Sequence, residues 1–154
     1  MKSYFDSDER RLSLRFHAAE WLGTPFAPHA MVRGAGTDCV HLVAAIYIAT
    51  DFLTEFAPPA YALDSGAHAK KSQLTAWLDA HPAFLKLDAR STPQPGDTLC
   101  FNMGLSEHHV GLMLDGSQFI HVLPRRFVLL SSLTEAYYAR RIASIYRPQE
   151  GAVS

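Results

Sequence analysis

Near Pro93 the sequence changes from helical patterns to short apolar runs that are separated by turn residues. Before that point, residues 8–22, 38–49 and about 67–80 predict helices, from the spacing of their apolar residues or from an apolar run too long for one strand. After it, strands are predicted for TLCFNM, HVGLML, QFIHVL, FVLL and IASIYR, with a short helix, SSLTEAYYA, before the last of them. Helices followed by a meander of antiparallel strands indicate an α+β fold.

The first predicted helix shows both its start and its periodicity in the sequence. Leu12, Phe16 and Ala19 recur at helical spacing. Asp6 or Ser7 is available as the N-cap, whose side chain accepts a hydrogen bond from the first turn. Together these signals predict a helix that begins near residue 8.

Length and composition fit one globular domain. The chain has 154 residues, of which 48% are hydrophobic and 19% charged, and its formal net charge is −1. We predict a single domain over residues 1–154, with a core at about 8–147 and a flexible tail at 148–154. No block of charge suggests a nucleic-acid partner, and no window approaches the roughly 18 apolar residues of a membrane span. The charged N-terminus argues against a signal peptide and predicts synthesis in the cytoplasm.

Cys39 lies in the first turn of the predicted helix at 38–49, which Thr37 or Asp38 would cap. The positive end of a helix favours the thiolate form of cysteine, which is the nucleophilic form. We therefore predict an accessible Cys39 thiol with a lowered pKa, whereas Cys100 alternates with apolar neighbours in a strand and is expected in the core. Position alone leaves open that Cys39 is a small buried apolar residue.

Two histidines lie on consecutive predicted strands that an Asp-Gly turn separates. A two-residue Asp-Gly loop would put His109 and His121 on opposite faces of the sheet. A three-residue loop that ends at Gly116 would pair Met113 with Ser117 and bring the two histidines opposite each other. A functional histidine pair therefore requires this second kind of loop, and Gly116 sits where the loop needs a left-handed residue.

These three side chains predict a cysteine nucleophile with a histidine base. Cys39 would attack, His109 would accept its proton and later give it to the leaving amine, and His121 would orient the ring of His109. The oxyanion would form near the backbone N–H of Cys39 at the start of the helix. This thiolate and imidazole chemistry needs no metal and no cofactor.

The motifs around these residues resemble the NlpC family of papain-like cysteine peptidases, which act as cell-wall endopeptidases. The resemblance rests on TPF, GTDCVHLV, PGDTLCFNM, HHVGLML and GSQFIHVL, and it spans roughly residues 20–147. It implies a papain-like fold and places the nucleophile, base and third polar residue of the family on Cys39, His109 and His121. It also implies hydrolysis of peptidoglycan stem peptides at a D-glutamyl–diamino acid bond. The chain looks most like small phage and prophage tail-associated members, so a phage tail or secretion machinery is an expected partner for delivery to the cell wall.

The sequence departs from the family pattern at two positions near the expected site. His41 replaces a small residue two positions after the nucleophile, and Phe26 stands where relatives often have a tyrosine. We consider His29, Asp38, His41 and His108 as substrate contacts. The plainer interpretations are a loop residue for His29, a helix cap or packing for Asp38 and His41, and an exposed strand edge for His108.

Three other functions use the same residues. Cys39, His109 and His121 could bind zinc, with His41 or His108 as a fourth ligand, although no characteristic metal-ligand spacing is present. A papain-like acyltransferase would use the same cysteine and histidine with a different acceptor. A non-catalytic binding module would keep the fold without a reactive thiol.

Overall fold

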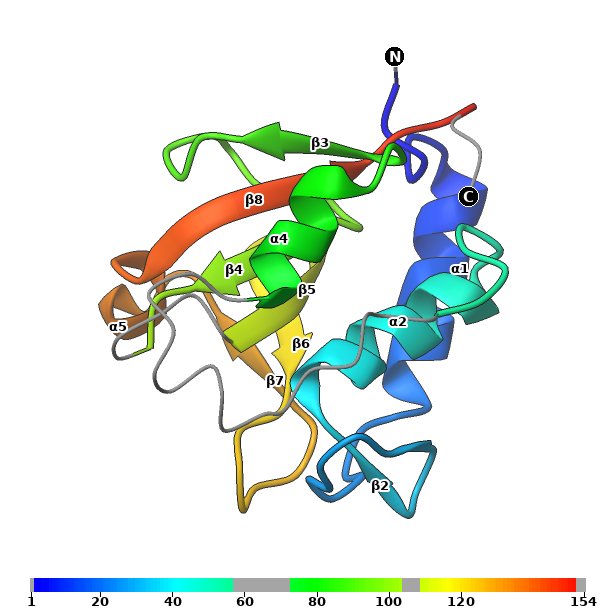
Figure 1. The fold of residues 1–154 in the computed structure, drawn as a ribbon, viewed down its shortest axis with the longest axis vertical. Coiled ribbons are helices and arrows are strands. Elements are labelled where there is room, and N and C mark those ends of the chain that lie inside the picture. Colours follow the sequence, from blue (N-terminus) through cyan, green and yellow to red (C-terminus); the bar gives the residue numbers. More distant parts are fainter. Residues whose placement is uncertain (1, 57–72, 104–108, 152–154) are drawn as a thin grey trace.

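The structure is a computed structural model that describes residues 2–56, 73–103 and 109–151 (Figure 1). Its helices are α1 (Asp8–Ala19), α2 (Cys39–Ala49), α4 (Gln73–Ala80) and α5 (Ala136–Ala139). A small hairpin is formed by β1 (Met31–Val32) and β2 (Gly36–Thr37). The large sheet is formed by β3 (Phe84–Leu87), β4 (Thr98–Phe101), β5 (His109–Asp115), β6 (Gln118–His121), β7 (Leu129–Ser132) and β8 (Ile142–Pro148).

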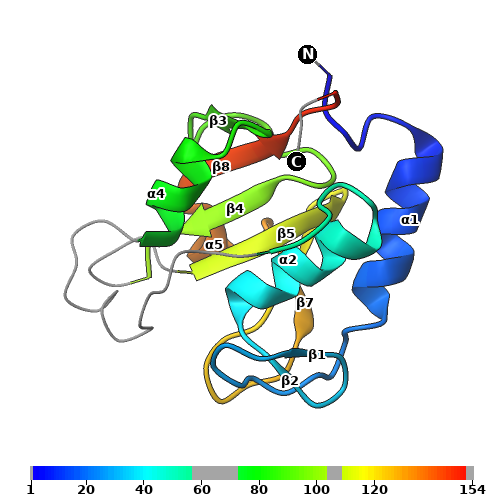
Figure 2. The same ribbon diagram turned by 45° about the vertical axis from the view of Figure 1, so that its right-hand side comes forward.

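The six strands of the large sheet pair antiparallel in the order β3-β8-β4-β5-β6-β7. Helices α1, α2 and α4 lie on one face of this sheet, and α5 lies on the other (Figures 1 and 2). The predicted α+β class is confirmed. None of the helices in the described part of the chain is long and apolar enough to cross a membrane.

The main core forms between α2 and the sheet. Helix α2 is apolar on nearly every side, and its Leu42 and Ile46 are fully buried in the same cluster as Val110 and Leu112 of β5. Burying a side chain of this size stabilises the fold by about 1.5–3 kcal/mol. This packing fixes the axis of α2 against β5, so the first turn of the helix lies beside the start of that strand.

Helix α1 begins where the sequence predicts, but it buries a different face. Ser7 is the N-cap and accepts a hydrogen bond from the backbone N–H of Arg10. The buried residues are Leu14 and Ala18, whereas Leu12 is 61% exposed. Phe16 is also exposed. The apolar residues whose spacing predicted the helix are therefore not the ones that contact the core.

The turn between β5 and β6 differs from the predicted loop. Met113 does not pair with Ser117; it pairs with Phe119, and the register shifts between Met113 and Asp115. Gly116 has a φ of 57°, the left-handed conformation that the sequence predicts there. The hairpin loop is therefore shorter than predicted, and a bulge in β5 adds one residue. The two changes together still place His109 and His121 on the same face of the sheet.

The core reaches further towards both ends of the chain than predicted. Phe5 is fully buried and lies so close to Gly96 that a Cβ there would be 2.1 Å from its ring. Ser3 forms an isolated β-bridge with Gln149, and the backbone N–H of Glu150 donates a hydrogen bond to the carbonyl oxygen of Lys2. Buried contacts thus extend beyond residues 8–147, and residues 149 and 150 of the predicted tail form backbone bonds with the start of the chain. An aromatic side chain fills the space at the helix–sheet junction, which explains why the first residues are held.

Candidate active site

Cys39 is the first residue of α2, as the sequence predicts. Asp38 is the N-cap and accepts a hydrogen bond from the backbone N–H of His41 at 2.8 Å. The Cys39 side chain lies against β5, where the backbone N–H of Val110 donates towards its sulfur. Val110 directly follows His109, so the thiol sits beside the strand that carries the predicted base.

The predicted lowering of the thiol pKa is wrong. Burial raises the pKa of Cys39 to about 12, and the negative charge of Asp38 adds to this effect. The N–H groups of Val110, Val40 and Cys39 itself favour the thiolate but do not offset the loss of solvent. Cys39 is only 8% exposed, so the predicted accessibility is wrong as well. The fully buried position of Cys100 agrees with its predicted place in the core.

His109 and His121 are joined by a hydrogen bond, which the sequence predicts. Nε2 of His109 lies 2.9 Å from Nδ1 of His121, and both side chains are buried. Extending the β5–β6 register by one residue places His121 across from Gly111, so the two histidines are diagonal neighbours rather than opposed ones. Diagonal side chains lie about 7–8 Å apart at the backbone, which aromatic rings can span.

The histidine pair lies on the sheet face opposite to the main core. The ring of His109 is 5.6 Å from that of Phe101, and the ring of His121 is 4.7 Å from that of Phe119 and 5.2 Å from that of Tyr138. Burial in this aromatic surrounding lowers the pKa of His121 to about 4. His121 is therefore neutral at pH 7 and carries one proton on one of its two ring nitrogens.

One further polar side chain completes this group. Nε2 of His121 lies 2.7 Å from Oγ of Ser131, on β7. The sequence analysis missed Ser131, because it assigned SSLTEAYYA to a helix whereas β7 continues through Ser132. The alternation of the strand FVLL, extended by two residues, is the signal that could have found it. Three neighbouring strands thus supply one chain of polar side chains.

Asp38 is an interior anchor rather than a surface contact. Its Oδ1 accepts from the ring Nδ1–H of His41 at 2.7 Å, and its Oδ2 accepts from the backbone N–H of His29 at 2.7 Å. Burial acts to raise the pKa of Asp38, but these hydrogen bonds, those from His41 above all, hold it below its ordinary value. A carboxylate that is 1% exposed cannot meet a substrate directly, which corrects the expectation of a substrate contact at Asp38.

The other predicted contacts have different positions. The ring of His41 is held by Asp38 and is flanked by the rings of His29 and Phe56, at 6.3 and 5.3 Å. His108 lies outside the described residues. In residues 2–56, 73–103 and 109–151, no three histidine, cysteine, aspartate or glutamate side chains are placed to hold a metal ion, so the zinc alternative gains no ligand set there.

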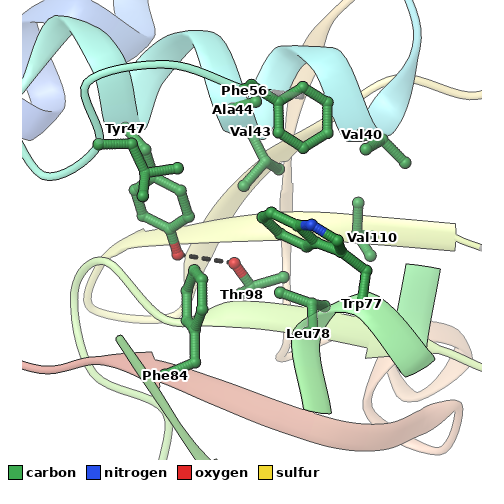
Figure 3. Close-up of a pocket in the computed structure, with 11 residues that line it drawn as sticks. Val40, Val43, Ala44, Tyr47, Phe56, Trp77, Leu78, Phe84, Thr98 and Val110 are labelled. Atoms are coloured by element: carbon green, nitrogen blue, oxygen red, sulfur yellow. Dashed lines mark hydrogen bonds between the residues drawn. The ribbon is translucent and has the colours of Figure 1, made fainter. Parts of the chain in front are cut away.

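A small cavity lies behind the site, between α2 and α4 (Figure 3). Val40 and Val110, the neighbours of Cys39 and His109, form part of its apolar wall. Its volume is about 20 Å³, room for about one water molecule. This space is too small for a peptide, and it belongs to the packing that holds the site in place.

Residues 23–147, which include Cys39, His109 and His121, match the sequence pattern of the NlpC/P60 family. This chain belongs to the NlpC/P60 family. The predicted resemblance to this family is confirmed. Closeness to phage-tail members stays a prediction.

Individual relatives agree with this assignment. The chain is similar to "Murein DD-endopeptidase MepS/Murein LD-carboxypeptidase" of Escherichia coli strain K12, with 34% identity over 53 residues. This match covers 34% of the chain and only 28% of that relative. A second E. coli strain, O157:H7, has a relative of the same description with the same identity and coverage.

Solved structures of the family share the fold. The NlpC/p60 domain of the peptidoglycan hydrolase SagA superposes with a TM-score of 0.57 at 19% identity, over 90% of this chain and 97% of that domain. A lipoprotein-like NLP/P60 protein from Staphylococcus aureus gives 0.64 at 19% identity, over 98% of this chain and 45% of that one. NlpC1 from Trichomonas vaginalis gives 0.59 at 19% identity, over 93% and 45%. The papain-like NlpC fold predicted from the sequence is therefore confirmed.

Proposed function

We propose that this chain is a cysteine peptidase that hydrolyses short murein stem peptides, with Cys39 as nucleophile, His109 as general base and His121 as the orienting residue. The observation that carries the proposal is the buried hydrogen bond between the two rings, next to the strand residue that contacts the Cys39 sulfur. A base held at one nitrogen by a neutral partner is the arrangement that thiol proteolysis uses.

In this proposal each nitrogen of His109 has a separate task. Because Nε2 is bonded to His121, we assign to Nδ1 the proton that Cys39 gives up as its sulfur attacks the scissile carbonyl. Cys39 and His109 lie on opposite faces of the sheet, so this transfer has to take place around the end of β5, where His109 is the first residue and Val110 contacts the thiol. The new C–S bond leaves an oxyanion, which the N–H groups at the start of α2 stabilise. His109 then gives its proton to the amine as the C–N bond breaks. Water hydrolyses the thioester with His109 again as base, and the thiol recovers its proton.

The bond that we expect to be cut is the one between D-glutamate and the diamino acid of the stem. The name of the E. coli relative offers two other murein bonds, that of a DD-endopeptidase and that of an LD-carboxypeptidase. The three cleavages leave fragments of different mass, so one digestion distinguishes them. Delivery to the cell wall by a phage tail or secretion machinery remains an expectation from the sequence.

His41, in the first turn of α2, is our proposed substrate contact. Its Nδ1 is committed to Asp38, so its Nε2 is the atom that can meet a polar group of the peptide. We expect His41→Ala to raise KM with little change in kcat, the pattern of lost ground-state binding. A gain in kcat/KM would show instead that the imidazole obstructs the substrate where relatives have a small residue.

The test of the function is digestion of purified muropeptides, read by mass spectrometry. The wild-type chain should release stem fragments, whereas Cys39→Ala and His109→Ala should release none and His121→Ala should retain some activity. The matched control is Cys100→Ala, which removes the other cysteine and should still cleave. Intact peptides with wild-type protein would overturn the proposal.

The same digestion separates the rival functions. An acyltransferase would yield products that carry an added acceptor, and a binding module would retain peptides without cutting them. A zinc enzyme would lose its activity to a chelator and regain it with zinc. Activity that survives chelation and depends on Cys39 supports the peptidase.

A further inference from the structure

We propose that Ser131 is a positioning residue of this site: it accepts a hydrogen bond from Nε2–H of His121 and thereby selects the tautomer in which His109 can take the thiol proton. This inference rests on the proposed function, because it assigns Ser131 a role in the same reaction. Ser131 acts through His121 and touches neither the thiol nor the substrate.

The three side chains form a line across adjacent strands of the large sheet. His109 on β5 bonds His121 on β6 at 2.9 Å, and His121 bonds Ser131 on β7 at 2.7 Å. Each ring nitrogen of His121 thus has one partner within the chain. His121 itself is fully buried, whereas Ser131 is partly buried.

Two directions of hydrogen bonding are possible along this line, and only one supports catalysis. In the first, Nε2–H of His109 donates to Nδ1 of His121, whose Nε2–H donates to the Ser131 hydroxyl. In the second, every bond is reversed and the proton of His109 sits on Nδ1. A neutral His109 in the second state has no lone pair at Nδ1, so it cannot accept the proton of Cys39.

The charged step of the reaction also requires the first direction. Once His109 has taken the proton, both of its nitrogens carry hydrogen and Nε2 can only donate. Nδ1 of His121 must then accept, so the proton of His121 has to be on Nε2 and needs an acceptor of its own. The Ser131 hydroxyl supplies that acceptor without any movement of the backbone.

Removal of the hydroxyl should therefore shift His121 towards the wrong tautomer. A buried N–H without an acceptor is rarer in proteins than a buried acceptor without a donor. In Ser131→Ala the proton of His121 is thus expected to move to Nδ1, where it can still donate to His109. The loss of one neutral hydrogen bond corresponds to about a tenfold fall in kcat.

The decisive measurement is nitrogen NMR of histidine-labelled protein without substrate, which reports the protonated nitrogen of each ring. Wild type should carry the proton on Nε2 of both His109 and His121. Ser131→Ala should move it to Nδ1 of His121, and Ser131→Thr, which keeps a hydroxyl, should restore the wild-type pattern. The matched control is Ser132→Ala, on the same strand, whose hydroxyl bonds Ser117 and Thr134 rather than a histidine.

Kinetics on a murein peptide supply the second readout. Ser131→Ala should lower kcat about tenfold with KM unchanged, while Ser131→Thr and Ser132→Ala stay close to wild type. A proton on Nδ1 of His121 in wild type, or wild-type tautomers and kcat in Ser131→Ala, would overturn the inference. If Ser131→Ala does not fold, the tautomers of wild type and Ser131→Thr decide. Expected tautomers in a protein that cleaves no murein peptide would refute the proposed function alone.

Discussion

Acidification should destabilise this protein through His121, by an amount that follows from its burial. The pKa of His121 is about 4 in the folded chain, against about 6.5 for an unperturbed histidine. Above about pH 6.5 the ring is neutral in both states, and its contribution to stability is fully present. As the pH falls from about 6.5 towards 4, the unfolded chain binds a proton that the folded chain does not. At 1.36 kcal/mol per pKa unit, the loss reaches about 2.5 kcal/mol by about pH 4.5.

The assay is urea unfolding of wild type and His121→Gln at about pH 7 and about pH 4.5. Glutamine does not titrate but keeps a donor and an acceptor near Nε2 of the replaced ring. Carboxylates such as Asp38 and Asp97 titrate in both proteins, so their effect cancels when the two pH-induced losses are subtracted. Wild type should lose about 2.5 kcal/mol more than the variant. Equal losses would refute the reasoning that burial holds His121 neutral.

Three further predictions concern separate parts of the molecule. Alkylation of Cys39 by iodoacetamide should be slow at about pH 7 and rise about tenfold per pH unit, because burial raises the thiol pKa to about 12; fast labelling at neutral pH would contradict this. Gly111→Ala should cost about 1–3 kcal/mol in urea unfolding, since the added Cβ would lie 2.8 Å from the ring of Phe119; an unchanged midpoint would mean that the ring moves freely. Asp97→Ala should cost about 3 kcal/mol, because it leaves Arg147 without the buried carboxylate that it contacts at 2.8 Å; a thermal midpoint equal to wild type would show that the pair contributes nothing.

The start of α2 was predictable because its signals are local. An N-cap acts within one turn, and Asp38 accepts from the N–H three residues later as the sequence indicates. The same holds for Ser7 at the start of α1. The buried face of α1 was not predictable in this way. Its contact with the core is set by which side meets α2 and β5, and an apolar spacing that includes the exposed Phe16 does not reveal that choice.

The positions of the two histidines relative to each other were predictable only in part. The sequence indicates that they share a face only if the hairpin shifts the register by an even number, and they do share it. It does not determine how the shift is made. Gly116 has the predicted positive φ, yet the loop is shorter and a bulge before Asp115 supplies the remaining residue. Whether two residues share a sheet face follows from the alternation of side chains along the strands. The length of the loop depends instead on the twist and packing of the strands.

The thiol pKa failed as a prediction because two opposing effects act on Cys39, and only one can be seen in the sequence. The N–H groups at the helix start favour the thiolate, but the burial that α2 gains against β5 outweighs them. A pKa of about 12 leaves almost no thiolate at pH 7, so a preformed ion pair with His109 is not the resting state expected here. The proton must leave the sulfur as the sulfur attacks. His109 must therefore be able to accept a proton at Nδ1 when the substrate arrives. In our proposal, the neutral, buried His121 and its hydrogen bond to Ser131 keep that nitrogen unprotonated.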